Sequence, residues 1–334
     1  MYNKILHRFS IVTAFSTFVL IFIGGLVTST GSGLSVPDWP TTYGENMFTF
    51  PIDKWVGGIK YEHGHRLFAS IVGLLTVILT IGIVFNDKRP WVKWLSFFAL
   101  GAVIIQGILG GLTVLFLLPT AISVAHGMLA QSFFCAVSAI ALFTSRWWRE
   151  DCEAVDIPGT ASIQKLSIIA VVVVFLQLAF GALMRHTFSG LSVPDFPLAY
   201  GHIFPSISNE AISAYNQELF HEGIKWSGDK PVAAYQIIIH LLHRYWAFIV
   251  GGIVTFLGYK LWSMKSLPRK LQKTGILLLS IVIVQFLLGI FTVLSRKEYI
   301  ITSIHVVIGA LVLVTCVLTA LTIARLRWNN KFSS

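Results

Sequence analysis

Long apolar stretches alternate with short polar ones along the whole chain. Eight of these stretches each reach or approach the ~20 residues that an α-helix needs to cross a bilayer. They lie near residues 5–28, 66–85, 94–118, 121–143, 163–184, 234–258, 275–294 and 300–324. The pattern predicts an all-α integral membrane protein with eight transmembrane helices. Two long loops, about 29–62 and 186–233, lie on one side, and short loops lie on the other.

The second part of the chain repeats the first. A loop motif of the form Leu-Ser-Val-Pro-Asp-aromatic-Pro occurs at residues 34–40 and again at 191–197. Further along, the paired positions are His65 and His243, Arg66 and Arg244, Gln106 and Gln285, Gly110 and Gly289, and His126 and His305. The duplication predicts two pseudo-symmetric four-helix bundles. We expect an N-terminal half over 1–145, a cytoplasmic linker over 146–162 and a C-terminal half over 163–334.

Composition agrees with a membrane protein, and charge predicts its orientation. Mean hydropathy is +0.76 and only 12% of the residues are charged, about half the share usual in soluble domains. Sixteen of the 25 Lys and Arg residues fall at the chain ends and around the short loops. By the positive-inside rule, this side and both termini are cytoplasmic. The net charge of +10 therefore reflects topology, and we expect no nucleic-acid partner.

Four histidines lie near the outer ends of predicted spans, where an ionisable side chain is costly and therefore often functional. His65 and His126 lie at similar depth on spans two and four, which are diagonal in an up-down bundle. His243 and His305 repeat this arrangement on spans six and eight. Each pair can hold one metal between facing side chains. Because each site offers two ligands and no cysteine or carboxylate cluster, the sequence favours axial ligation of haem over zinc.

The two halves differ three residues before the first histidine of each pair. Glu62 precedes His65, whereas His240 precedes His243. A carboxylate beside an axial ligand can move protons or stabilise charge during a reaction. Two other interpretations stay open: Glu62 orients the His65 imidazole, or it is a solvated residue at the interface. The arginines that follow the histidines, Arg66 and Arg244, could pair with haem propionates or extend toward lipid headgroups.

The residues alone are compatible with more than one class of protein. A two-haem membrane cytochrome that only transfers electrons would carry the same duplicated histidines. Two histidines fill both axial positions of a haem iron, so oxidation at that iron requires one of them to detach. A transporter with parallel repeats would have helices broken near the midplane, whereas the polar residues here cluster near one face. The insertion about 206–226 predicts either an interfacial helix or an ordinary surface helix.

Taken together, these motifs resemble the haem A synthase family of cytochrome oxidase assembly proteins. The resemblance covers essentially the whole chain. It rests on Gly24-Gly25-Leu26-Val27, residues 30–40, Glu62-His63-Gly64-His65-Arg66, His126, His243-Arg244 and His305. Arginine commonly follows the Gly-Gly motif in this family, and the second copy has Arg185 there, but the first has Thr28. The cysteine pair that some members carry in an outer loop is missing from this sequence.

The resemblance implies an oxidoreductase that converts the C8 methyl group of haem O into a formyl group, giving haem A. Haem O would bind between His65 and His126, where Glu62 matches the family's important glutamate. A structural or electron-relaying haem b would bind between His243 and His305, with Arg185 at a propionate. The implied setting is the bacterial cytoplasmic membrane. Haem O synthase and an electron donor are the implied partners, and a homo-oligomer is compatible with the sequence.

Overall fold

The computed structural model describes residues 2–152, 157–224 and 230–327, and these residues form helices without a β-strand. Eight helices are long and apolar enough to cross a membrane, which confirms the predicted fold class. They are α1 (Lys4–Ser29), α2 (Ile59–Asn86), α3 (Pro90–Leu115), α4 (Thr120–Thr144), α5 (Thr160–His186), α7 (Ala234–Ser263), α8 (Arg269–Leu294) and α9 (Tyr299–Arg327). Residues 153–156 of the predicted linker and 225–226 of the predicted insertion lie outside the described residues. So does the end of the predicted C-terminal half, 328–334, with its Lys331.

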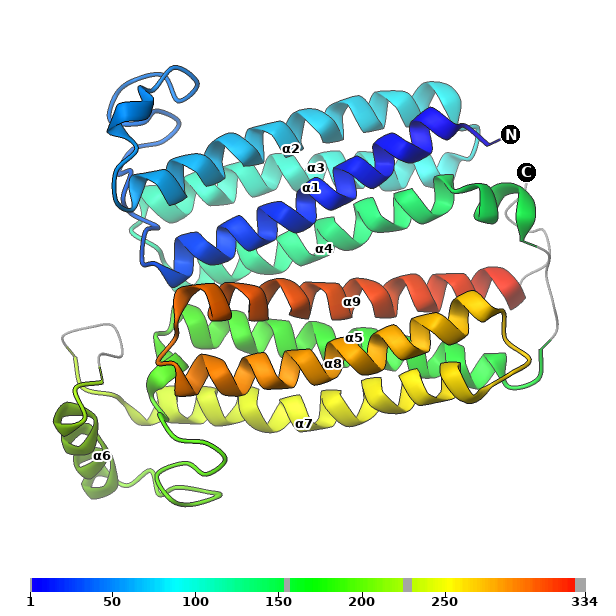
Figure 1. Ribbon diagram of the computed structural model, residues 1–334. Helices are drawn as coiled ribbons and strands as arrows, with labels where there is room; N and C mark the ends of the chain where they lie inside the picture. The colour runs from blue at the N-terminus through cyan, green and yellow to red at the C-terminus, as the bar shows by residue number, and fades with distance from the viewer. Residues whose placement is uncertain (1, 153–156, 225–229, 328–334) are drawn as a thin grey trace.

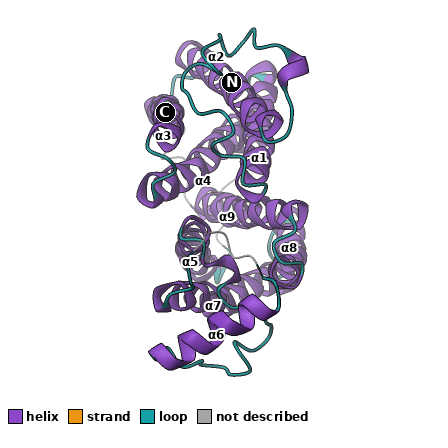
Figure 2. Cartoon of the chain, turned by 90° about the vertical axis from the view of Figure 1, so that its left-hand side faces the viewer, coloured by secondary structure: helices purple, strands orange, loops and turns teal. Residues whose placement is uncertain are grey.

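The eight spans form two groups of four. In the first group α1 packs against α2, α2 against α3, and α3 against α4. The ring closes because α4 packs against α1. In the second group α5 packs against α7, α7 against α8, and α8 against α9. This ring closes because α9 packs against α5 (Figure 2). The helices α2 and α4 are therefore diagonal, as are α7 and α9. This order is compatible with two pseudo-symmetric bundles.

The two groups meet along α9, which contacts α1 and α4, and along α4, which also contacts α5. Accordingly, α4 and α9 are the most buried of the eight spans. The long loops and the short helix α6 (Asn209–His221) lie at one end of the bundles. The start of α1 and the end of α9 lie at the other end (Figure 1). The predicted arrangement of loops on two sides is thus present.

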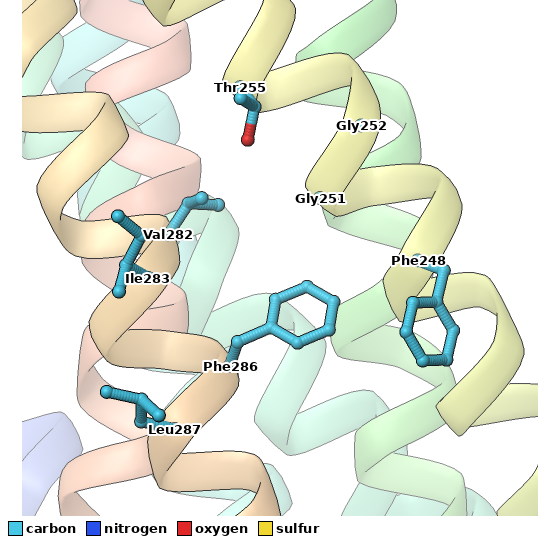
Figure 3. Close-up of a pocket in the computed structure, with 8 residues that line it drawn as sticks. All are labelled: Phe248, Gly251, Gly252, Thr255, Val282, Ile283, Phe286 and Leu287. Atoms are coloured by element: carbon cyan, nitrogen blue, oxygen red, sulfur yellow. The ribbon is translucent and has the colours of Figure 1, made fainter. Parts of the chain in front are cut away.

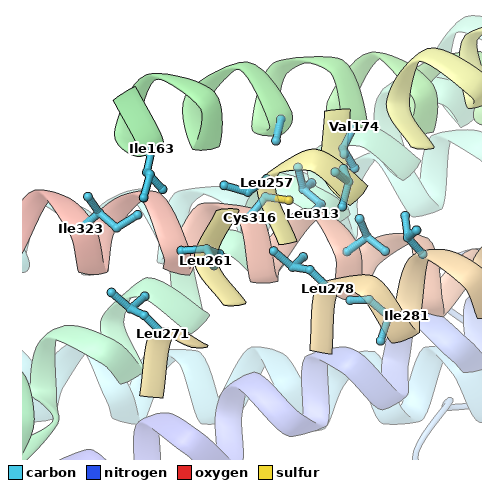
Figure 4. Close-up of a cluster of buried hydrophobic side chains, with 14 of the residues drawn as sticks. Ile163, Val174, Leu257, Leu261, Leu271, Leu278, Ile281, Leu313, Cys316 and Ile323 are labelled. Atoms are coloured by element: carbon cyan, nitrogen blue, oxygen red, sulfur yellow. The ribbon is translucent and has the colours of Figure 1, made fainter. Parts of the chain in front are cut away.

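Interlocking aliphatic side chains hold each group together. In the second group, Leu257, Leu261, Leu278 and Leu313 are almost fully buried around Cys316 (Figure 4). The first group has an equivalent core that includes the almost fully buried Leu79, Ile83 and Ile140. Many other apolar side chains point outward instead, for example Phe85 at 83% exposure. Outward apolar residues are expected of helices whose solvent is lipid.

A buried ion cluster closes the end of the first group opposite the long loops. Asp87 follows α2, and its carboxylate accepts hydrogen bonds of 2.7 Å from both Arg89 and Arg149. Arg89 also donates to the carbonyl oxygen of Phe143 at the end of α4. Burial alone would raise the pKa of Asp87, but the two arginines and their hydrogen bonds lower it overall. The cluster therefore ties α2, α4 and the following segment together.

Two loop predictions can now be compared with the structure. The first long loop ends earlier than predicted, because α2 begins at Ile59 rather than at 66. The polar turn from Glu62 to Arg66 lowers the hydropathy there, although it is helical. The predicted helix in the second loop is confirmed as α6. The Ser208 side chain caps its first turn, and Leu219 packs fully buried against the loop core.

Candidate functional site

Each long loop folds back on itself through the aspartate of the repeated motif. The Asp38 carboxylate accepts hydrogen bonds of 2.8 Å from the backbone N–H groups of Tyr43 and Gly44. The Tyr43 hydroxyl donates to the carbonyl oxygen of Ser35 at 2.6 Å. Burial alone would raise the pKa of Asp38, but these hydrogen bonds and one from a threonine lower it. The same contacts recur in the second loop among Asp195, Tyr200, Gly201 and Ser192.

The arginine after each first histidine fixes the loop to its bundle. The Arg66 guanidinium donates to the carbonyl oxygens of Val36, Asp38 and Thr41 and to the Glu62 carboxylate, at 2.6–3.1 Å. Arg244 donates in the same way to the carbonyl oxygens of Val193, Asp195 and Leu198. Four of the five N–H groups of Arg66 are thus engaged within the protein. The contact of Arg66 and Arg244 with haem propionates stays a prediction.

Glu62 and His240 occupy equivalent places beside these arginines. Glu62 is 4% exposed, and it accepts hydrogen bonds from its arginine at 2.6 Å and from the Val36 N–H at 2.8 Å. His240 lies 3.0 Å from its arginine through Nε2 and 3.0 Å from the Ser189 carbonyl through Nδ1. These partners assign the ring proton of His240 to Nδ1. The first half therefore buries a carboxylate where the second half has an imidazole, and Glu62 is not a solvated residue.

The four predicted ligand histidines come together in two pairs. His65 and His126 lie on the diagonal helices α2 and α4 and are close enough to interact electrostatically. The same is true of His243 on α7 and His305 on α9. The Nδ1 atoms of His65, His126 and His305 are buried without a hydrogen-bond partner among the described residues. Buried polar atoms left unpaired in this way mark a candidate ligand site.

A glycine on a neighbouring helix supports each of these imidazoles. An added Cβ would come within 3.0–3.5 Å of the ring for Gly24 against His65, Gly110 against His126, Gly181 against His243 and Gly289 against His305. A Cβ at Gly24, Gly181 or Gly289 would press on the ring, and one at Gly110 would touch it, so the glycines form a cradle for the imidazoles. The cradles come from α1, α3, α5 and α8, the helices that do not carry the histidines.

A glutamine precedes three of the four cradle glycines by one helical turn. Gln106 donates through its side-chain amide to the carbonyl oxygen of His126 at 2.9 Å. Gln177 donates to the carbonyl oxygen of His243 at 3.1 Å. Gln285 is the third, and its backbone faces the His305 ring. The spacing Gln-x-x-x-Gly occurs in the sequence at 106–110, 177–181 and 285–289, but the internal repeat pairs only the first with the third, so Gln177 and Gly181 were not predicted as site residues.

Arg185 lies where the two halves meet at the outer end. It belongs to the last turn of α5, and its Nη2 donates to the Ser29 hydroxyl at 2.6 Å and to the Gly25 carbonyl oxygen at 3.3 Å. Both acceptors belong to α1. Arg185 is also close enough to His305 to interact with it electrostatically. The structure thus brings Arg185 to the second histidine pair, and its contact with a propionate stays a prediction.

A shallow groove between α7 and α8 is separate from the histidine pairs. The ring of Phe286 reaches across it toward Gly251 (Figure 3). Its other lining residues are Phe248, Gly252, Thr255, Val282, Ile283 and Leu287. Because none of them is ionisable or a metal ligand, this groove is not a candidate site for chemistry.

The residues at the two histidine pairs fit haem. Each pair supplies two imidazoles from diagonal helices, and each ring is backed by a glycine that leaves it room. A porphyrin supplies the other four ligands to its iron, so two histidines complete the coordination. The fold and these sites define a class: membrane proteins of two four-helix groups, each with a histidine pair suited to axial ligation of a haem.

The chain belongs to the family of cytochrome oxidase assembly proteins (COX15-CtaA), whose family model matches residues 7–58 and 59–317. It is 28% identical to a haem A synthase of Alkalihalophilus pseudofirmus, over 92% of this chain and 93% of that one. It is 26% identical to a haem A synthase of Sphingopyxis alaskensis, over 92% and 88% of the two chains. For a haem A synthase of Rickettsia prowazekii the identity is 24%, over 94% and 96%.

Proposed function

We propose that this protein is a haem A synthase, an oxidoreductase that converts the C8 methyl group of haem O into a formyl group. The observation that carries the proposal is the duplicated histidine cradle that differs between its copies at Glu62 and His240. Relatives named haem A synthase match over nine-tenths of this chain, which supports the same conclusion. A protein that only relays electrons has no need of that asymmetry.

We assign the substrate site to the first half of the chain and the cofactor site to the second. Residues 1–145 form the substrate half, where His65 and His126 hold haem O. Residues 163–334 form the cofactor half, where His243 and His305 hold a haem b, and 146–162 join the two. When bound, this haem b supplies one-electron redox chemistry beside the substrate. The contacts between α9 and both α1 and α4 support a short path between the sites.

The residues of this chain contribute positioning and proton handling. Conversion of a methyl to a formyl group is a four-electron oxidation in which the carbon loses two hydrogen atoms and gains one oxygen atom. Glu62 is the buried carboxylate nearest in sequence to a substrate ligand, one helical turn before His65. We assign it the task of accepting a proton at one carboxylate oxygen. Arg66 and the Val36 N–H hold that carboxylate in place, and Arg66 also keeps the loop closed over the bundle.

The reaction requires a redox partner and a source of substrate. We propose an electron donor and a haem O synthase in these two roles, and a homo-oligomer as the assembly. We place the protein in the cytoplasmic membrane of a bacterium, with both termini in the cytoplasm. The excess of Lys and Arg around the short loops supports this orientation.

The direct test of the proposed function is conversion of haem O into haem A. The wild-type protein is produced in cells that make haem O but lack haem A synthase, and the extracted haems are separated by chromatography. Haem A is expected with the wild-type protein and is expected to be lost with His65→Ala. A wild-type protein that binds two haems and yields no haem A would instead be a two-haem electron-transfer cytochrome.

A further inference from the structure

Two basic side chains lie together at the outer end of the second half. Arg185 is one helical turn after Gly181, the glycine that supports His243. Lys297 lies in the turn between α8 and α9, and its side chain passes Gly190, where an added Cβ would come within 3.2 Å of the lysine Cδ. Burial, and then the positive charge of Arg185, lower the pKa of Lys297. The two cations are therefore near enough to interact electrostatically and are partly removed from water.

No carboxylate compensates these two charges among the described residues. Arg185 donates only to neutral groups of α1, the Ser29 hydroxyl and the Gly25 carbonyl oxygen. Lys297 has no ion pair in the part of the chain that the structure describes. The adjacent Glu298 is engaged elsewhere, because it accepts the N–H of Ile301 at the start of α9. Two neighbouring cations that are partly removed from water are costly unless an anion joins them.

The first half has the same backbone at this place but no cation. By the internal repeat, Thr28 is equivalent to Arg185 and Leu118 to Lys297. Leu118 and Lys297 share the left-handed conformation, with φ of 59° and 63°. Gly33 lies against the Leu118 side chain, where an added Cβ would come within 3.5 Å, as Gly190 lies against Lys297. The difference between the halves is therefore one of charge.

We propose that Lys297 acts with Arg185 to bind the propionate carboxylates of the haem held by His243 and His305, and that this cation pair makes that haem the resident one. Propionates are the only anionic groups of a haem, and ammonium and guanidinium groups bind carboxylates through charge-assisted hydrogen bonds. The first half lacks the pair, so a haem between His65 and His126 is held less tightly and can enter as substrate and leave as product. The inference rests on the proposed assignment of cofactor and substrate halves.

The test measures how firmly haem b is held, without any turnover. Lys297→Leu introduces the residue of the first half, Lys297→Gln keeps the length without the charge, and Lys297→Arg keeps the charge. The proteins are purified from cells that make no haem O, and transfer of haem b to excess apomyoglobin is timed. We expect transfer to be at least tenfold faster for the Leu and Gln variants and near the wild-type rate for Arg. Lys265→Leu, on the opposite side of the membrane, is the matched control.

The midpoint potential of the low-spin haem b gives a second readout on the same samples. A nearby positive charge favours the reduced haem, so loss of the Lys297 charge should lower the potential, and the Arg variant should restore it. Unchanged transfer rate and potential in both neutral variants would overturn the inference. If the wild-type protein still forms haem A in cells that supply haem O, the proposed function survives that outcome.

The converse exchange tests the first half. Thr28→Arg together with Leu118→Lys places the cation pair beside the substrate histidines. We expect haem A to stay bound through purification at a several-fold higher fraction than in the wild-type protein. Release at the wild-type level, in a protein that still forms haem A, would contradict the claim that the pair decides which haem is resident.

Discussion

The glycine cradles give a prediction whose size follows from the distances between each glycine and its histidine. In Gly181→Ala the new methyl group would lie 3.0 Å from Cε1 of His243, which is several tenths of an ångström inside ordinary contact. Either the imidazole or α5 must shift. Overpacking of this kind costs about 1–3 kcal/mol. If the shift occurs in the haem-bound state, haem b affinity falls by a factor of roughly 5 to 150, since ~1.4 kcal/mol is tenfold.

The matched control is Gly252→Ala, because an added Cβ there meets nothing within 4 Å. Both changes gain similar helix propensity, so their difference isolates the contact with the histidine. The assay is titration of the haem-depleted proteins with haem, followed through the low-spin spectrum. Equal affinity in the two variants would refute the view that Gly181 makes room for the His243 ring.

Three other predictions concern the two histidine pairs, the Asp87 cluster and the orientation in the membrane. His305→Ala should remove the low-spin haem b spectrum, whereas His126→Ala should keep it and lose haem A formation; a loss of both in either variant would contradict the two-site assignment. Asp87→Ala should lower stability by about 3–5 kcal/mol at neutral pH, because it leaves the buried Arg89 and the half-buried Arg149 without their carboxylate. Since the folded-state pKa of Asp87 is lowered, its contribution is present at neutral pH and lost as pH falls through that value. Thermal unfolding in detergent should therefore show the gap from wild type closing in acid, and a constant gap would contradict this. In a background without native cysteines, Thr49→Cys should react with an impermeant thiol reagent in intact cells, and Ser266→Cys only after permeabilisation; the reverse pattern would invert the topology.

The sequence was sufficient for features that repeat or that depend on bulk hydropathy. Eight apolar stretches predict the eight spans, because a bilayer-crossing helix leaves a long unbroken signal. The duplication, with alternating helix directions, predicts that His65 and His126 lie on diagonal helices. Hydropathy failed at the start of α2, because the turn that carries Glu62 and Arg66 is polar although helical.

The remaining features depend on contacts between distant segments. Glu62 binds the Val36 N–H, and Arg66 binds carbonyl oxygens of the same loop, 25 to 30 residues away. The periodicity of apolar residues along the sequence does not predict such contacts between a loop and a helix. The electrostatic contact of Arg185 and Lys297 depends on how the α8–α9 turn lies against the loop that follows α5. Three of the four cradle glycines follow a glutamine by four residues in the sequence. Their contact with the histidine rings depends on helix packing, which the sequence does not report.

The most direct test of the central claim compares Glu62→Gln with His240→Gln. Both residues lie beside an arginine at equivalent places, but only Glu62 carries a carboxylate, and only the first half is proposed to carry the reaction. The measurement is the ratio of haem A to haem O extracted from cells that supply haem O, with both haem sites shown to be occupied. The account predicts at least a tenfold lower ratio for Glu62→Gln, about 1.4 kcal/mol of barrier, and a near wild-type ratio for His240→Gln. A wild-type ratio in Glu62→Gln would contradict it.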